Sequence, residues 1–404
     1  MKILISTPNI NLNISKVVSL LKKLNYLESF WTTLFLPFKI KFLKKSYYKE
    51  INLKFVRFIF FKQLMRKICI ILNIKKLYSN DENIFSIDAI NKDLDIKVAK
   101  YVSKNNKINI IYSYEDCSKE TFKVAKEKNI QTICDLTSPY WLLKKNILDQ
   151  EKKMHPDWHL SSTEVMSEYK CKIKDEELSL SDRVIVASSF TAKSLRLFNK
   201  KKKLDIKIVP YGIDLPKTKI INLRKVNEKF KIFFAGRPTI SKGIHYLIKS
   251  LIQLDFPWQI EIAGSIPEKP VEISKKLHTF FKDERCKFLG QISNKDVLKK
   301  MQTSHVFLFP SLFEGFGQVL LESLANSLPI VTTENTGGMD FIENGKNSFI
   351  TPIRDEKNTV EILNKLYLDE EFRRHVSENS FLTAKKFTWE KYQNEIKSYI
   401  KNIS

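Results

Sequence analysis

The stretch SHVFLFPSLFEGFGQVLLESLANSLPIVTT, residues 304–333, decides the fold. It opens with a short apolar run at 306–309 that a proline ends, as is typical of a buried strand. Gly315 and Gly317 follow, and two glycines this close let the backbone turn sharply and approach a ligand. Apolar residues then recur at helical spacing as far as Ser327. The stretch therefore predicts a strand, a glycine turn and a helix.

The start of this predicted helix suits an anion, because its unpaired N–H groups and positive dipole end face the glycine turn. Glu314 stands just before the helix and Glu322 lies about two turns further on. Carboxylates so placed suit hydrogen bonds to vicinal hydroxyls, as on a sugar or a ribose. A helix-initiating glutamate and an exposed surface glutamate would have the same spacing, so spacing alone leaves both interpretations open.

The residue pattern is more specific than the spacing. P-S-x-x-E-G-F-G-x-V-x-L-E, from Pro310 to Glu322, resembles the signature of the family 4 retaining glycosyltransferases (glycosyl transferases group 1). The resemblance extends over nearly the whole chain and implies the α/β GT-B fold, two Rossmann-like doubly wound domains facing a central cleft. It implies that Glu314 contacts the donor sugar and that Glu322 holds the nucleotide ribose. The other donor-site residues of this motif are Gly315, Phe316 and Gly317.

A second motif, GRPTISKG at 236–243, places Arg237 and Lys242 on the loop after an apolar strand. It resembles the family's G-R-x-x-x-x-K-G, whose two cations hold the donor diphosphate. A guanidinium binds phosphate oxygens as a fork, and the ammonium adds a point charge. Together they would neutralise the nucleoside diphosphate as it leaves. We therefore expect Glu314, Arg237 and Lys242 to be the catalytic residues, without a divalent metal ion.

Two further loops complete the donor side by resemblance. Gln291 and Ile292 follow a predicted strand, at the place where the family's loop meets the nucleotide base. Gly337 and Gly338 resemble the family's G-G loop near the donor phosphates. The resemblance implies a nucleotide-sugar, carrying UDP or GDP, as co-substrate and no further cofactor.

The first half of the chain alternates predicted strands and helices, as in a doubly wound domain, whose ligands lie at the carboxyl ends of the strands. Its first loop carries asparagines where the family has a glycine pair, and Asp135 ends the strand predicted at 130–136. Each candidate residue of this domain could equally be a helix cap, an aromatic side chain of the core or part of the buried scaffold. The acceptor-side candidates are Asn11, Asp135, Tyr140, Trp141 and Glu177.

Residues 30–76 mix aromatic side chains with many cations. Twelve Lys or Arg lie between Lys39 and Lys76, against one acid, Glu50. Such a surface suits an anionic membrane, where each cation contributes roughly 1 kcal/mol. Single-stranded nucleic acid would suit it as well, and a helical insertion with core aromatics and solvated lysines is the third interpretation. We favour the membrane surface, and expect no nucleic-acid partner.

Length and composition fit a two-domain protein with an anionic partner. With 404 residues the chain suits two domains. We expect them at 1–212 and 213–385, with a helix at 386–404 packing back on the first. The net charge of +24 favours an anionic partner or surface, and a general abundance of Lys, Asn and Ile is the other source of this charge. Five scattered cysteines, no visible signal peptide and no long apolar run predict a cytoplasmic protein. The basic aromatic stretch at 30–76 predicts that it is peripheral on the inner face of the membrane.

Taken together, the sequence predicts a transferase that moves a sugar, with retention, from a nucleotide-sugar to a glycan or lipid-linked acceptor in cell-envelope or polysaccharide biosynthesis. A lone D-x-D at 93–95 lies in a lysine-rich helical stretch and does not predict a metal site. The alternative is a non-catalytic membrane- or nucleic-acid-binding protein that keeps the fold. A phosphorylase or epimerase of the same fold is a weaker alternative.

Overall fold

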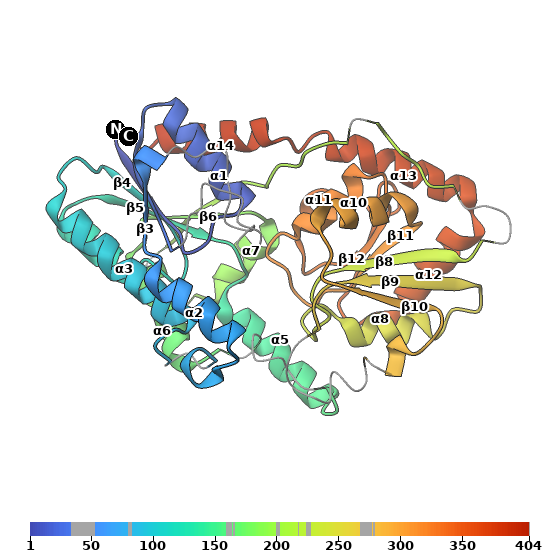
Figure 1. Cartoon of the computed structure of the whole chain (residues 1–404). Coiled ribbons are helices and arrows are strands. Elements are labelled where there is room, and N and C mark those ends of the chain that lie inside the picture. Colours follow the sequence, from blue (N-terminus) through green and yellow to red (C-terminus); the bar gives the residue numbers. More distant parts are fainter. Residues whose placement is uncertain are drawn as a thin grey trace.

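The chain folds around two parallel β-sheets, one in each half of the sequence (Figure 1). The computed structural model describes residues 1–33, 53–79, 83–158, 164, 166–198, 203–216, 218–223, 228–266, 277 and 279–403. Helices cover both faces of each sheet, and both termini lie at the first sheet. The predicted α/β class with two Rossmann-like domains is confirmed.

The first sheet has, within the described residues, seven strands in the order β3-β2-β1-β4-β5-β6-β7. All its pairs are parallel, and the central strands are apolar and buried because helices cover both faces. The strands are β1 (Ile3–Ser6), β2 (Leu27–Thr32), β3 (Val56–Phe58), β4 (Ile110–Tyr114), β5 (Gln131–Leu136), β6 (Arg183–Val186) and β7 (Asp205–Ile208).

The helices of the first domain are α1 (Leu12–Lys23), α2 (Phe61–Ile71), α3 (Ile87–Lys104), α4 (Lys119–Glu127), α5 (Trp141–Met154), α6 (Glu168–Leu180) and α7 (Ser189–Ser194). In Figure 1, α1 lies above the sheet, whereas α3 and α6 lie below it. The D-x-D motif lies in α3, where the buried carboxylate of Asp95 accepts the backbone N–H groups of Glu120 (2.7 Å) and Thr121 (2.8 Å). This aspartate therefore caps the start of α4.

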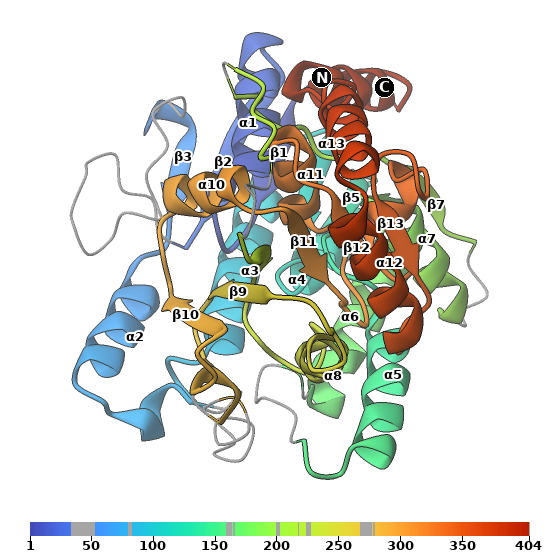
Figure 2. The same cartoon turned by 90° about the vertical axis from the view of Figure 1, so that its right-hand side faces the viewer.

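The second sheet has six described strands in the order β10-β9-β8-β11-β12-β13, again parallel. Its strands are β8 (Phe230–Ala235), β9 (Trp258–Ala263), β10 (Cys286–Gly290), β11 (Val306–Phe309), β12 (Ile330–Thr333) and β13 (Phe349–Thr351). Its helices are α8 (Ile244–Leu251), α10 (Asn294–Thr303), α11 (Gln318–Ala325), α12 (Glu356–Leu368) and α13 (Glu370–Ala384). Figure 2 shows this domain from its own side, with α8 below β9 and α11 above β11.

The last helix, α14 (Trp389–Lys401), crosses from the second domain to the first and packs on α1. Its buried face carries Tyr392 and Ile396, and Gln393 donates to the backbone carbonyl of Lys16 (2.8 Å). The two chain segments that join the domains run side by side here. A β-carbon on Gly212 would lie 2.5 Å from the backbone nitrogen of Trp389, so this crossing admits only glycine without a shift.

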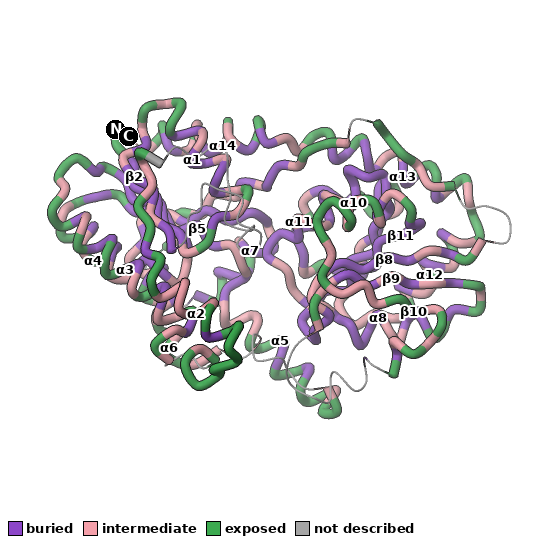
Figure 3. The backbone as a smooth tube through the Cα atoms, in the orientation of Figure 1, coloured by how far each residue is buried: buried purple, intermediate pink, exposed green. Residues whose placement is uncertain are grey.

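The sequence did not predict β2 and β3, because they lie in or beside the lysine-rich aromatic stretch, where the alternation of apolar residues is hidden. Of that stretch, residues 34–52 lie outside the described residues. Figure 3 shows α2, which follows β3, as an exposed and half-buried segment at the surface, in contrast to the buried strands. Among the described residues, no helix has the length and apolar content needed to cross a membrane.

Candidate active site

A polar cavity of about 320 Å³ lies between the two domains. The first domain contributes its first loop and the ends of β4 and β5, whereas the second contributes the glycine turn before α11. The lining residues are Pro8, Asn9, Asn11, Asn13, Tyr114, Thr137, Tyr211, Glu314, Phe316, Gly317 and Gln318. The motif chosen from the sequence thus faces the asparagine loop across the cleft.

Glu314 lines this cavity and forms an ion pair with Lys242, which lies beside it and does not itself line the cavity. They are 72 residues apart, but their loops leave the carboxyl ends of neighbouring strands, β8 and β11. Both side chains keep about a quarter of their surface, 23% and 25%, so a ligand can reach them. Lys242 also lies over the ring of Phe309 at 5.6 Å. The structure therefore joins two of the three predicted catalytic residues.

The glycine turn at residues 315–317 is held in place by contacts with the first domain. The carbonyl of Gly315 accepts hydrogen bonds from Ser188 and, at 2.9 Å, from Thr191, both at the start of α7. A β-carbon on Gly315 would lie 2.2 Å from the carbonyl oxygen of Thr137, so the two domains touch backbone to backbone. On the neighbouring loop Asp340 accepts the N–H of Ser189 (2.8 Å).

The start of α11 faces the cavity through Gly317, which has φ +77° and precedes the helix. This left-handed conformation favours glycine, and it directs the free N–H groups of the first turn toward the cleft. Gly337 packs against this turn, because its β-carbon would lie 2.3 Å from the carbonyl oxygen of Phe316. Gly338 follows it in the same short helical turn. The two predicted glycine loops are therefore neighbours.

Arg237 lies two residues after the end of β8 and is half-buried, on the same loop as Lys242. This loop is closely packed, since a β-carbon on Gly243 would lie 1.8 Å from the carbonyl oxygen of Pro310. Gly243 also has φ +67° and precedes α8. The turn that follows Lys242 is thereby fixed against the strand end that leads to Glu314.

Glu322 lies in α11 and does not line the cavity. It accepts a hydrogen bond from Asn294 Nδ2 (3.0 Å), the first residue of α10, and burial raises the pKa of its carboxyl. The predicted base loop, exposed Gln291 and half-buried Ile292, is separated from this asparagine only by Ser293. Glu322 and the predicted base loop are therefore neighbours at one end of the second domain.

On the acceptor side, Asn11 lines the cavity. Its side chain caps α1 by accepting the N–H of Ile14 (2.9 Å), and it accepts the hydroxyl of Tyr114 at 3.3 Å. This capping bond gives Asn11 a structural role in a loop that contains no glycine. Asn9 and Asn13 line the cavity beside it.

Asp135 lies behind the cavity and is 2% exposed. The hydroxyl of Tyr112 donates to it at 2.5 Å, and burial raises its pKa to about 7. Three more buried tyrosines face this carboxyl, and in each case burial and the charge of Asp135 raise the phenol pKa. They are Tyr114, Tyr211 and Tyr392. Two of them, Tyr114 and Tyr211, line the cavity.

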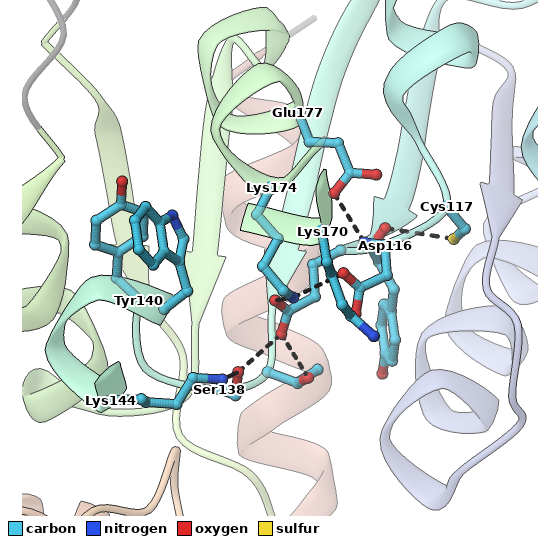
Figure 4. Close-up of polar contacts among 12 residues, drawn as sticks. Asp116, Cys117, Ser138, Tyr140, Lys144, Lys170, Lys174 and Glu177 are labelled. Atoms are coloured by element: carbon cyan, nitrogen blue, oxygen red, sulfur yellow. Dashed lines mark hydrogen bonds and ion pairs between the residues drawn. The ribbon is translucent and has the colours of Figure 1, made fainter. Parts of the chain in front are cut away.

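Glu177 is buried at 1% exposure and accepts the backbone N–H of Asp116 at 2.8 Å (Figure 4). It also accepts the backbone N–H of Ser118 at 2.8 Å. Burial raises its pKa to about 8. It holds the loop between β4 and α4 and does not line the cavity. The resemblance suggested a cleft-lining role, whereas this geometry fits the scaffolding interpretation.

Next to this loop lies a buried cluster of opposite charges that the sequence did not single out (Figure 4). Lys174 pairs with Glu115 and Asp116; burial lowers its pKa, but the two carboxylates outweigh this and raise it. Glu115 also accepts the hydroxyl of Ser138 (3.1 Å), which in turn accepts Nζ of Lys144 (3.1 Å). In the sequence, the two adjacent acids Glu115 and Asp116 directly after β4 could have indicated this cluster.

Tyr140 and Trp141 do not line the cavity. Both donate to the same carboxylate oxygen of Asp175 in α6, at 2.6 and 2.7 Å. Trp141 instead borders a separate hollow of about 440 Å³ between α5 and α6. These two aromatic candidates therefore join helices of the first domain.

The burial of Asp135 predicts a pH dependence of stability. Its folded pKa is about 7, whereas an unfolded aspartate titrates near ~3.9. Between these values the folded state binds one proton more than the unfolded state, so the free energy of unfolding falls by about 1.4 kcal/mol per pH unit. In urea unfolding we expect the wild type to lose about 2 kcal/mol relative to Asp135→Asn between pH 5 and pH 7.

Asp149→Asn provides the matched control, because Asp149 is exposed on α5. Its stability profile should follow that of the wild type. If the Asp135→Asn profile also ran parallel to the wild type over this pH range, the assigned burial effect would be wrong.

Comparisons with known proteins agree with this geometry. Residues 217–383 match the family model of glycosyl transferases group 1. The capsular polysaccharide biosynthesis glycosyltransferase CapM of Staphylococcus aureus is 29% identical over 194 residues, 44% of this chain and 48% of CapM. The chain thus spans about half the length of this curated relative. YqgM of Bacillus subtilis, an uncharacterized glycosyltransferase, is 22% identical over 71% of this chain and 76% of its own.

Among solved structures, sucrose-phosphate synthase from Thermosynechococcus elongatus covers 100% of this chain and 99% of its own, with TM-score 0.72 and 16% identity. HepE of Anabaena, solved in complex with UDP, covers 100% of both chains with TM-score 0.68 and 17% identity. At such identities the likeness concerns the fold. The second domain is thus similar to the glycosyl transferases group 1 family over residues 217–383, and the two domains have the GT-B fold.

Proposed function

We propose that this protein is a glycosyltransferase that moves a sugar from a nucleotide-sugar to a glycan or lipid-linked acceptor, with retention at the anomeric carbon. The observation that supports this best is the Lys242–Glu314 ion pair at a polar cavity between the domains. The family of the second domain and its likeness to CapM favour a role in polysaccharide or cell-envelope biosynthesis.

The donor site in this proposal lies on the second domain. Lys242, Arg237 and the first turn of α11 offer positive charge and N–H groups to the diphosphate. Glu322 would accept the ribose hydroxyls, beside the loop at 291–292 that would meet the base. HepE was solved with UDP and with UDP-glucose, so UDP is the first nucleotide to test. GDP is the second.

The reaction breaks the bond between the anomeric carbon and the oxygen of the diphosphate, where negative charge develops. Lys242 and Arg237 stabilise that charge more strongly in the transition state than in the bound donor, which is the condition for catalysis. The acceptor hydroxyl attacks from the same face, and its proton passes to the departing phosphate oxygen. Glu314 orients Lys242 and accepts hydroxyl groups of the donor sugar. These side chains supply the cationic charge that a divalent metal ion would otherwise provide.

The acceptor would enter from the side of the first domain. Asn9, Asn11 and Asn13 line that side of the cavity with amide groups, and amides can both donate to and accept from a sugar hydroxyl. Tyr114 adds a phenol to the same wall. This neutral and polar wall suits a glycan hydroxyl as the attacking group.

Glu314→Gln and Lys242→Ala test the site. Each variant breaks the ion pair and removes a charge at the donor site, so we expect the turnover number to fall about 100-fold or more. The measurement is nucleoside diphosphate release from UDP-glucose, with a lipid-linked or glycan acceptor mixture. Glu343→Gln and Lys346→Ala, from an exposed ion pair of the same domain, are the matched controls. Wild-type turnover in either site variant would reject the assignment.

We further propose that α2 and the residues after it bind an anionic membrane surface at the inner face of the cytoplasmic membrane. Several large apolar side chains are exposed here, including Phe61 (62%), Ile71 (74%) and Leu72 (62%). Cations surround them, among them the exposed Lys75 and Lys76. Apolar side chains beside cations suit the boundary between headgroups and acyl chains. The five free and buried cysteines fit a reducing compartment.

The double variant Lys75→Glu/Lys76→Glu tests this surface. Each cation near an anionic membrane contributes roughly 1 kcal/mol, so reversing two should weaken binding to phosphatidylglycerol vesicles more than tenfold. Lys385→Glu/Lys386→Glu, an exposed pair in the second domain, makes the same change in net charge. Vesicle sedimentation compares the two. Equal losses in both variants, or no loss in the first, would remove the membrane claim.

The non-catalytic alternative remains testable by the same variants. A binding protein that only keeps the fold would not need Lys242 beside Glu314 at a cavity. It would bind vesicles or nucleic acid and release no nucleoside diphosphate from any nucleotide-sugar.

A further inference from the structure

Two imidazoles and a carboxylate meet where the two domains touch on the side of α5 and α8. Glu151 lies near the end of α5, His155 follows this helix, and His245 is the second residue of α8. One ligand atom from each lies within 4.8 Å of the other two. Glu151 is 0% and His245 1% exposed, whereas His155 is half-buried and gives solvent access. None of the three lines the cavity at Glu314.

We propose that Glu151, His155 and His245 bind a divalent transition-metal ion of the zinc type, which joins the two domains. Two imidazole nitrogens and a carboxylate oxygen are a donor set that zinc accepts, with one position left for a fourth ligand. The first domain supplies two of these ligands and the second domain supplies the third. The site is separate from the proposed transfer reaction and carries no step of it.

The carboxylate is already oriented for this role. Arg354 Nε donates to Oε1 of Glu151 (2.6 Å), which leaves Oε2 directed toward the imidazoles. A partner on the second oxygen that fixes the ligating carboxylate is typical of metal sites. Burial raises the pKa of Glu151, but hydrogen bonds from His245 and Arg354 outweigh this and lower it, so the carboxylate is ionised at neutral pH.

Both imidazoles present Nε2 to the cluster. His245 Nε2 lies 2.9 Å from Glu151 Oε2, and among the described residues its Nδ1 has no hydrogen-bond partner. Burial lowers the pKa of both histidines, which keeps them neutral at pH 7, the form that binds metal. A zinc ion would take the place of the proton between His245 and Glu151.

Tyr246 supplies a candidate for the fourth position. Its hydroxyl lies 3.0 Å from Glu151 Oε2 and 3.0 Å from His155 Nε2, between two of the proposed ligands. Tetrahedral zinc with bonds of about 2.0–2.1 Å needs ligand atoms roughly 3.3 Å apart. The three ligand atoms lie within 4.8 Å of one another, so the half-buried ring of His155 would have to move inward when the ion binds. Water could take the same position.

Without the ion, the same side chains form a hydrogen-bonded contact between the domains. The ion would strengthen this contact. It would thereby hold α8 against α5, and α8 begins directly after Gly243, next to Lys242. Metal binding would limit the relative movement of the domains without entering the cleft.

The experiment uses the full chain without a polyhistidine tag, freed of metal with a chelator. Isothermal titration with Zn²⁺ should give one equivalent bound at micromolar affinity or tighter, and the melting temperature should rise with Zn²⁺. Co²⁺ should give the intense visible absorption of a four-coordinate site. In His155→Gln the affinity should fall at least tenfold and the thermal shift should be lost.

His375→Gln is the matched control, because His375 is an exposed histidine of α13. It should bind Zn²⁺ as the wild type does. His155 is chosen because it is half-buried, so its variant should keep the metal-free melting temperature of the wild type; His245→Asn provides the second site variant. Absence of stoichiometric binding, or unchanged affinity in His155→Gln, would overturn the proposal.

Discussion

The contact on which the cleft depends is the backbone carbonyl of Gly315, held by hydroxyl groups of Ser188 and Thr191 from the other domain. The glycine is required here because a β-carbon would lie 2.2 Å from the carbonyl oxygen of Thr137. The close contact between Gly315 and Thr137 brings the first turn of α11 to the carboxyl edge of the first sheet. The proposed donor site and the asparagine loop therefore share one cavity, although they belong to different domains.

The fold and the centre of the site could be predicted because they rest on local patterns. Short apolar runs predicted most strands, and the parallel pairing of β8 and β11 explains why Lys242 meets Glu314. Gly337 lies against Phe316 for the same reason, since β11 and β12 are neighbours. Motifs at the ends of adjacent parallel strands come together once the sheet order is known.

The outer parts of the site could not be predicted, because they depend on which way a side chain turns. Tyr140 and Trp141 follow a strand end, but both turn to Asp175 on α6. Glu177 caps the loop before α4, a role that depends on α6 packing against α4. The cluster at Glu151 and His245 joins residues 94 positions apart in different domains, and no spacing in the sequence indicates it.

The measurement that tests the central claim most directly is the thermal shift of the purified protein with UDP, GDP and ADP, without added metal ion. Our account predicts a clear rise in melting temperature with one nucleoside diphosphate, in proportion to ln(1 + [L]/Kd). The rise should be lost in Arg237→Ala and kept in Arg374→Ala, a change at an exposed arginine of α13. No shift with any nucleotide, or the same shift in Arg237→Ala, would contradict the proposed donor site.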